Sequence, residues 1–163
     1  MICTRLMVAS KIRGVLVSVH GVGVLIRGPS GAGKSLIALN LMRRGHKLVS
    51  DDLVEVVAEE GGIPIGRSIE EHVRIEVCGL GIFRASTLIP EGTVFSSPIH
   101  LVVDLDAYDP VRDAGRIVPE TGLCRLLQSD VIQVRLPLPE RSDPALLIEL
   151  LARQFKETGT VTP

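Results

Sequence analysis

The sequence predicts a single α/β domain in which one sheet carries a glycine-rich loop between a strand and a helix, with an extra β-rich section and a C-terminal helix. Three observations predict this fold class. Short apolar runs bounded by turn residues recur along the chain and are typical of buried strands. Two segments with helical apolar spacing have residues at their ends that favour a helix terminus. The chain has 163 residues, about the length of one domain, so we expect residues 1–163 to form one unit.

The strands are predicted from apolar runs, in order along the chain. The first two, residues 14–19 and 22–26, lie on either side of the turn dipeptide His20-Gly21 and are expected to be neighbours. Further strands are predicted at residues 47–49, 53–57, 99–105 and 131–136. The sheet that they form is not required to be wholly parallel.

Two helices are predicted from their apolar spacing and their ends. The first covers residues 34–44 and is followed by Gly45, a residue typical of the position after a helix end. The second begins at Pro144, with Asp143 as its N-cap, and continues to Gly159. Apolar spacing along this second helix indicates packing against the core or against a partner.

A phosphate-binding pattern joins the second predicted strand to the first predicted helix. The pattern G-x-x-x-x-G-K-[ST] is matched at every fixed position by Gly28, Pro29, Ser30, Gly31, Ala32, Gly33, Lys34 and Ser35. Glycines let backbone N–H groups turn inward around phosphate oxygens, the lysine adds a positive charge, and the serine hydroxyl can ligate Mg²⁺. The pattern predicts a site for nucleotide phosphates, and residues 28–35 are called the phosphate loop below.

Three acidic positions are candidates for chemistry beside the phosphate loop. Asp51 and Asp52 interrupt a strand-like segment just after the first predicted helix, where one of them could act as general base toward a hydroxyl acceptor. A solvated turn explains the same pair, because aspartate is favoured in turns. Asp104 ends an apolar run in the manner of a Walker B strand, whose aspartate helps to hold Mg²⁺. From the residues alone, Asp52 and Asp104 are equally plausible partners of the loop.

Residues 72–78 supply further polar groups if they form a strand. Alternation would place His72, Arg74, Glu76 and Cys78 on one face. From that face Glu76 could reach a metal ion and Arg74 a phosphate. A half-exposed strand with its polar face in water explains the same alternation.

Composition limits the compartment and the partners. The 18 basic and 19 acidic residues nearly balance, which gives no electrostatic reason to expect binding to nucleic acid or to a membrane surface. Cys3, Cys78 and Cys124 are odd in number and widely spaced, unlike a disulfide framework or a zinc site. No run is long and apolar enough for a signal peptide or a membrane span, so we expect a cytoplasmic protein.

Four sequence blocks resemble the catalytic domain of the HPr kinase/phosphorylase family. The blocks, which begin at Gly14, Gly21, Arg44 and Glu76, are GVLV, GVGVLIRGPSGAGKS, RGHKLVSDD and EVCGLGI. Their order and spacing match over roughly residues 13–156. The resemblance implies a fold close to that of phosphoenolpyruvate carboxykinase, a short form without the family's N-terminal regulatory domain, and assembly as a hexamer.

The same resemblance implies an activity and roles for particular residues. It implies a kinase that uses ATP and Mg²⁺ to phosphorylate a serine of HPr, the phosphocarrier protein of the sugar phosphotransferase system, and that removes the phosphate by phosphorolysis. Lys34 would bind the transferred phosphate, and Ser35 and Glu76 would ligate Mg²⁺. Asp52 would be the base in the kinase direction and the acid in the reverse direction.

Outside those positions the match to the family is looser. Asp51 would be a neighbour of the base in the site, and Arg116 aligns loosely with a family arginine that stabilises the phosphate charge. Arg13 stands where the family has an active-site histidine, Leu36 where it has an acidic residue, and Cys78 where it has an arginine. These three departures bear mainly on phosphorolysis.

Two other functions fit the same motifs. A small ATPase or small-molecule kinase would use Asp104 for its metal ion and would turn over without a protein acceptor. A degenerate nucleotide-binding regulator, suggested by the three departures, would bind Mg-ATP without turnover.

Overall fold

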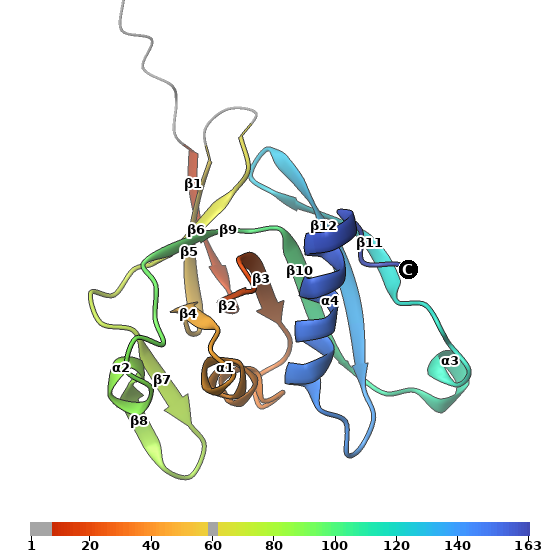
Figure 1. Cartoon of the computed structure of the whole chain (residues 1–163), viewed down its shortest axis with the longest axis horizontal. Coiled ribbons are helices and arrows are strands. Elements are labelled where there is room, and N and C mark those ends of the chain that lie inside the picture. Colours follow the sequence, from red (N-terminus) through yellow and green to blue (C-terminus); the bar gives the residue numbers. More distant parts are fainter. Residues whose placement is uncertain (1–7, 59–61) are drawn as a thin grey trace, which may run out of the picture.

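The computed structural model describes residues 8–58 and 62–163 and has a mixed six-stranded sheet at its centre (Figure 1). In spatial order its strands are β11 (Glu120–Leu126), β12 (Ser129–Leu138), β10 (Leu101–Ala107), β3 (Val22–Arg27), β2 (Val15–Val19) and β4 (Lys47–Ser50). β10 is parallel to both β3 and β12, whereas β2 is antiparallel to both β3 and β4. The strands β3, β4, β10 and β12 therefore all end at the same edge of the sheet, called the carboxyl edge below.

Shorter strands form a second sheet and a hairpin. The second sheet has the order β1 (Val8–Arg13), β5 (Leu53–Ala58), β6 (Ile65–Ser68) and β9 (Ser96–Pro98), and all of its pairs are antiparallel. The hairpin pairs β7 (Arg74–Val77) with β8 (Gly81–Arg84). In Figure 1 this hairpin lies near α1, away from β12.

Two longer helices pack together on one face of the central sheet. They are α1 (Lys34–Arg43) and α4 (Pro144–Thr158), which share one apolar layer of the core; in Figure 1, α4 crosses in front of the central strands and α1 lies below them. α4 begins as predicted, because the Asp143 carboxylate accepts a hydrogen bond from the Leu146 N–H at 3.0 Å, and it ends at Gly159 with φ 73°. The remaining helices, α2 (Ala85–Leu88) and α3 (Pro110–Asp113), are one turn each. No helix in the described ranges is both long and apolar enough to cross a membrane.

The core has two apolar layers separated by the central sheet. Val24 and Ile26 of β3 pack in the layer that also contains α1 and α4, whereas Leu25 packs in the layer toward the second sheet. All three side chains are fully buried. A strand covered on both faces needs a continuous apolar run rather than alternation, which is the pattern found at 22–26.

The predicted α/β class is confirmed, and so are the strands and helices expected from strong apolar runs. Five short strands, β1, β6, β8, β9 and β11, were not predicted from the sequence, and neither were α2 and α3. These strands are short or interrupted by polar, glycine or proline residues, so local periodicity gives little signal for them. Cys78 and Cys124 are free thiols, and Cys3 lies outside the described residues.

Gly23 of β3 is required by close contact with the chain beside β9. A Cβ atom at position 23 would lie 1.6 Å from the carbonyl oxygen of Pro98, which is backbone and cannot rotate away. The same strand end is fixed by the Gly23 N–H, which donates to His100 Nδ1 at 2.9 Å, and by the Gly23 carbonyl, which accepts from the His100 N–H at 2.9 Å. The position therefore joins β3 to the segment that leads into β10.

Replacing Gly23 by alanine is expected to lower the free energy of unfolding by about 3 kcal/mol or more, because overpacking against fixed backbone exceeds the usual range for added methyl groups. Gly122→Ala is the matched control, since a Cβ there meets nothing within 4 Å. Urea unfolding of both variants measures the difference. Equal stability of the two variants would contradict the packing described here.

Candidate active site

The phosphate loop connects the end of β3 to the start of α1 at the carboxyl edge. Gly31 and Gly33 adopt φ 82° and φ 83°, conformations that L residues rarely adopt. Gly33 is the N-cap of α1 and offers no side chain to the helix end. In the described part of the chain, no hydrogen-bond acceptor is found for the N–H groups of Gly31, Gly33, Lys34 and Ser35. Free N–H groups at a helix N-terminus form a site for phosphate oxygens.

Lys34 folds back over this loop. Its Nζ donates to the carbonyl oxygens of Gly28 and Pro29, both at 2.9 Å. These two neutral acceptors hold the ammonium group at the loop itself. A phosphate group would be a stronger partner for Lys34 than either carbonyl, because its oxygens are charged.

Ser35 joins the loop to the turn between β4 and β5. Its Oγ donates to the carboxylate of Asp51, with distances of 2.8 Å to Oδ1 and 3.0 Å to Oδ2. The N–H of Glu76, at the end of the β7–β8 hairpin, donates to Asp51 Oδ2 at 3.3 Å. Because β4 and β3 both end at the carboxyl edge, topology places Asp51 beside the loop.

Burial raises the pKa of the Asp51 carboxyl above its ordinary value. Hydrogen bonds from the Ser35 hydroxyl and the Glu76 N–H oppose this effect, while the nearby carboxylates of Asp52 and Glu76 add to it. Asp51 therefore lies near two other carboxylates, and no cation is among the groups that shift its pKa. A bound divalent cation would remove that unfavourable charge.

The donor set at this point fits Mg²⁺. Asp51 and Glu76 offer carboxylate oxygens and Ser35 offers a hydroxyl, and hard oxygen ligands of this kind are what Mg²⁺ prefers. Ser35 and Glu76 were the ligands expected from the sequence. Asp51 contacts the Ser35 hydroxyl and the backbone N–H of Glu76, so its carboxylate lies next to both residues.

Asp52 lies at the solvent side of the same turn. Its side chain is 75% exposed, and its Oδ1 accepts from Nη1 of Arg13 at 3.3 Å. Its φ is 74°, a left-handed conformation that is uncommon for residues other than glycine. The Gly14 N–H donates to the Asp52 carbonyl at 2.9 Å and fixes the turn against the β1–β2 junction. This geometry directs Asp52 toward solvent rather than toward the core.

Arg13 is the site residue that apolar patterning did not find. It ends β1, a strand that the sequence did not predict, and only its pairing with β5 brings it to Asp52. The sequence offered one signal, because the family resemblance puts Arg13 at the position of an active-site histidine. The pair is largely solvent-exposed, so its electrostatic contribution is small and screened by salt.

Two other candidates are not brought to this cluster. Asp104 accepts from the Arg27 guanidinium at 2.7 and 2.9 Å and from the side chain of Gln133. Its pKa is lowered below the ordinary value because these hydrogen bonds outweigh desolvation by burial. Arg116 follows α3 and lies within 4.0 Å of Asp113 and 3.7 Å of Glu120.

The expected strand over residues 72–78 is shorter in the structure. β7 covers only Arg74–Val77, and His72 and Cys78 lie outside it in a bend and a turn. The four polar groups therefore do not share one strand face. Burial of Ile75 between exposed Arg74 and Glu76 keeps the expected alternation within the strand itself.

Comparisons with known proteins agree with this geometry. The family model described as HPr Serine kinase C-terminal domain matches residues 4–161. Proteins named HPr kinase/phosphorylase from Geobacillus sp. (strain WCH70) and Bacillus subtilis (strain 168) are 38% and 36% identical to this chain over 156 residues. Each alignment covers 94% of this chain and 50% of the relative, so the chain spans about half the length of these curated relatives.

A solved structure is also similar over most of the fold. The Hpr(Ser) kinase/phosphatase from Coxiella burnetii aligns with a TM-score of 0.82 and 27% sequence identity, covering 92% of each chain.

Asp51→Asn is expected to raise the free energy of unfolding at pH 7 without Mg²⁺ by about 1 kcal/mol, the size typical of relieving an unfavourable functional group. Because the folded pKa of Asp51 is raised, the wild-type protein gains stability as the pH falls through that pKa. The advantage of the variant therefore disappears in acid. Chemical unfolding at several pH values measures both effects.

Asp52→Asn is the matched control, because the Asp52 side chain is exposed and its replacement is expected to change stability by less than about 0.5 kcal/mol. An Asp51→Asn protein that is less stable than wild type at every pH would show that burial does not dominate at Asp51.

Proposed function

Because the chain belongs to the HPr Serine kinase C-terminal domain family, we propose that it transfers the γ-phosphoryl group of ATP to a serine hydroxyl of HPr, the phosphocarrier protein of the sugar phosphotransferase system. The observation that carries this proposal is the contact between the phosphate loop and the β4–β5 turn, where Ser35 bonds Asp51 and exposed Asp52 lies next in the chain. The names of the relatives support HPr as the acceptor.

Binding of ATP is assigned to the phosphate loop. Lys34 Nζ exchanges the Gly28 and Pro29 carbonyls for phosphate oxygens, and the free N–H groups at the start of α1 donate to the same phosphates. The fold of the loop sets the positions of the backbone N–H groups before the reaction begins, and Lys34 is already held at the loop. They stabilise the charge that spreads over the transferred phosphoryl group.

Ser35, Asp51 and Glu76 are proposed to hold Mg²⁺. The bound ion supplies neutralisation of the β- and γ-phosphate charges. Ser35 Oγ, which donates to Asp51 in this structure, would then turn a lone pair toward the ion. Asp51 is added to the two ligands expected from the resemblance because it contacts both of them.

Proton transfer is assigned to Asp52. The seryl oxygen of HPr forms a bond to the γ-phosphorus as the bond from that phosphorus to the β–γ bridging oxygen breaks, and the seryl proton passes to the Asp52 carboxylate. ADP and phosphoseryl-HPr are the products. Arg13 remains charged at neutral pH and holds Asp52 by its 3.3 Å contact, but it cannot accept this proton.

The same groups are proposed to catalyse phosphorolysis, in which inorganic phosphate removes the phosphoryl group from phosphoseryl-HPr. An oxygen of inorganic phosphate attacks the phosphorus of phosphoseryl-HPr, the bond to the seryl oxygen breaks, and the acid form of Asp52 returns a proton to that oxygen. Pyrophosphate is released. The exchange of the family histidine for Arg13 bears on this direction, because a guanidinium does not relay protons at neutral pH.

The proposal extends to where the enzyme acts and how it assembles. We propose that the protein acts in the cytoplasm and that it assembles as a homo-hexamer, the oligomer that the family resemblance implies. Large apolar side chains around α3 and β11 support an interface between copies: Val111 is 95% exposed, Ile117 93% and Leu123 67%. Such exposure is unusual for isolated monomers when the residues cluster.

Purified chain incubated with labelled γ-phosphate Mg-ATP is expected to transfer label to HPr from the same organism. Asp52→Asn should slow the transfer about 10²- to 10⁴-fold, the contribution of a general base, while nucleotide binding is retained. Asp104→Asn should retain transfer, because Asp104 is occupied by Arg27 and Gln133. Pyrophosphate release from phosphoseryl-HPr and phosphate tests the reverse direction.

The same assay tests Arg116 and the competing functions. Arg116→Ala lowers the transfer rate if this arginine stabilises the phosphate charge, and an unchanged rate removes it from the site. ATP hydrolysis without HPr that is lost in Asp104→Asn would favour a small ATPase. Tight ATP binding without any turnover would favour a regulator and overturn the kinase proposal.

Sedimentation velocity at micromolar concentration is expected to show one species of six chains. Leu123→Asp, which puts a charge in the exposed apolar area, should shift the distribution to smaller species. A monomer in the wild-type protein would contradict the assembly proposed here without bearing on phosphate transfer.

A further inference from the structure

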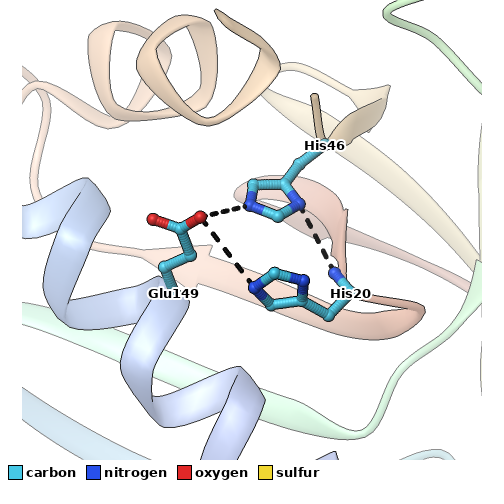
Figure 2. A group of neighbouring side chains, drawn as sticks. All are labelled: His20, His46 and Glu149. Atoms are coloured by element: carbon cyan, nitrogen blue, oxygen red, sulfur yellow. Dashed lines mark hydrogen bonds and ion pairs between the residues drawn. The ribbon is translucent and has the colours of Figure 1, made fainter. Parts of the chain in front are cut away.

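A second cluster of side chains lies at the edge of the sheet opposite the phosphate loop. His20 occupies the turn after β2, His46 immediately precedes β4, and Glu149 reaches in from α4 (Figure 2). One ligand atom of each residue lies within 4.8 Å of one of each of the others. β2 and β4 are antiparallel neighbours, with Ser18 paired to Lys47, so the sheet itself brings the two histidines together.

The histidine in the turn is held in a conformation that aims its ring inward. His20 and Gly21 have φ 53° and φ 84°, the signs required of the two central residues of a type I′ hairpin turn. The His20 and His46 rings meet edge to face with centroids 4.6 Å apart. Figure 2 shows both rings turned toward the Glu149 carboxylate.

Hydrogen bonding leaves one atom of this cluster unsatisfied. His46 Nε2 lies 2.9 Å from Glu149 Oε1, a normal hydrogen bond, whereas His20 Nε2 lies 3.9 Å from the same oxygen. His20 Nε2 is buried and has no hydrogen-bond partner among the described residues. A buried polar atom without a partner calls for a specific explanation, and an absent ion is one.

We propose that His20, His46 and Glu149 bind a divalent transition-metal ion of the Zn²⁺ class. Two imidazole nitrogens and one carboxylate oxygen form a common zinc ligand set, which leaves a fourth position for water. Bonds of about 2.0–2.1 Å place tetrahedral ligand atoms about 3.3 Å apart. The two distances to Glu149 Oε1, 2.9 and 3.9 Å, lie on either side of that value, so small side-chain movements suffice.

One neighbouring group, the Arg44 guanidinium, orients the carboxylate ligand. Arg44 donates to Glu149 Oε2 at 2.8 Å, which orients the carboxylate and leaves Oε1 for the metal. His46 Nδ1 accepts from the His20 N–H at 3.4 Å, so the ring proton sits on Nε2 in this structure. Metal binding at Nε2 moves that proton to Nδ1 and breaks a contact that is already long for a hydrogen bond.

The ion connects three elements that are distant in sequence. It ties the β2–β3 turn and the start of β4 to α4, beside the layer of core that contains α1. Because the cluster and the phosphate loop lie at opposite edges of the sheet, the ion stabilises the fold rather than contacting the substrate. This inference is independent of the phosphate-transfer proposal.

Calorimetric titration of the untagged full chain with Zn²⁺ tests the site, with excess Mg²⁺ present to occupy the oxygen ligands at the phosphate loop. One Zn²⁺ is expected per chain, and His20→Ala and Glu149→Gln should each weaken its binding at least tenfold. His72→Ala is the matched control, because His72 is exposed and lies outside the cluster. Zn²⁺ should also raise the melting temperature of wild type and His72→Ala but not that of His20→Ala.

Co²⁺ serves as a spectroscopic probe of the ligands. Intense visible absorption without thiolate charge-transfer bands is expected for two histidines and a carboxylate, and it should be absent from His20→Ala. Thiolate bands would assign the ion to a cysteine instead. Absence of Zn²⁺ binding, or equal binding by wild type and His20→Ala, would overturn the proposal, and circular dichroism of His20→Ala verifies that the variant is folded.

Discussion

Burial of β3 on both faces is the constraint on which the rest of the structure depends. This strand lies between β2 and β10, with helices on one side and the second sheet on the other. Each fully buried aliphatic side chain contributes about 1.5–3 kcal/mol to folding, so the strand has little freedom to shift. The two ends of β3 lead into opposite edges of the central sheet. The phosphate loop continues from Arg27, and the turn at His20 precedes Val22.

The directions of the strands bring the phosphate loop and the β4–β5 turn to the same edge of the sheet. β4 returns parallel to β3 although the strand between them is antiparallel to both, so the turn after β4 meets the loop after β3. Asp51 is thereby held against Ser35 in a half-buried position where its charge is disfavoured. Asp52, one residue later, is turned to the solvent by its left-handed backbone. Adjacent carboxylates thus acquire different environments, one suited to a cation and one to an acceptor hydroxyl.

Asp104, the other acidic candidate from the sequence, has partners that do not belong to the phosphate loop. A Walker B pattern needs a carboxylate free to face the nucleotide, but the parallel register sets Asp104 opposite Arg27. The guanidinium then holds both carboxylate oxygens. This bidentate pair joins β3 to β10 and occupies both carboxylate oxygens of Asp104. The opposite edge of the sheet collects a different set of polar groups, the two imidazoles of His20 and His46 with the carboxylate of Glu149.

The sequence by itself determined the phosphate-loop pattern and the strands and helices with strong apolar runs, and it singled out Asp51 and Asp52 as candidates beside Asp104. These features are local, because glycine conformations, helix caps and buried runs leave their marks within a few residues. Only the tertiary structure decided that Asp51 rather than Asp52 contacts Ser35, that Arg13 reaches Asp52, and that His20, His46 and Glu149 meet. Each of these contacts joins residues at least 16 positions apart in the sequence, and the His46–Glu149 contact joins residues 103 positions apart. Strand pairing and the packing of α1 and α4 on the sheet create such contacts, and no local pattern in the chain encodes them.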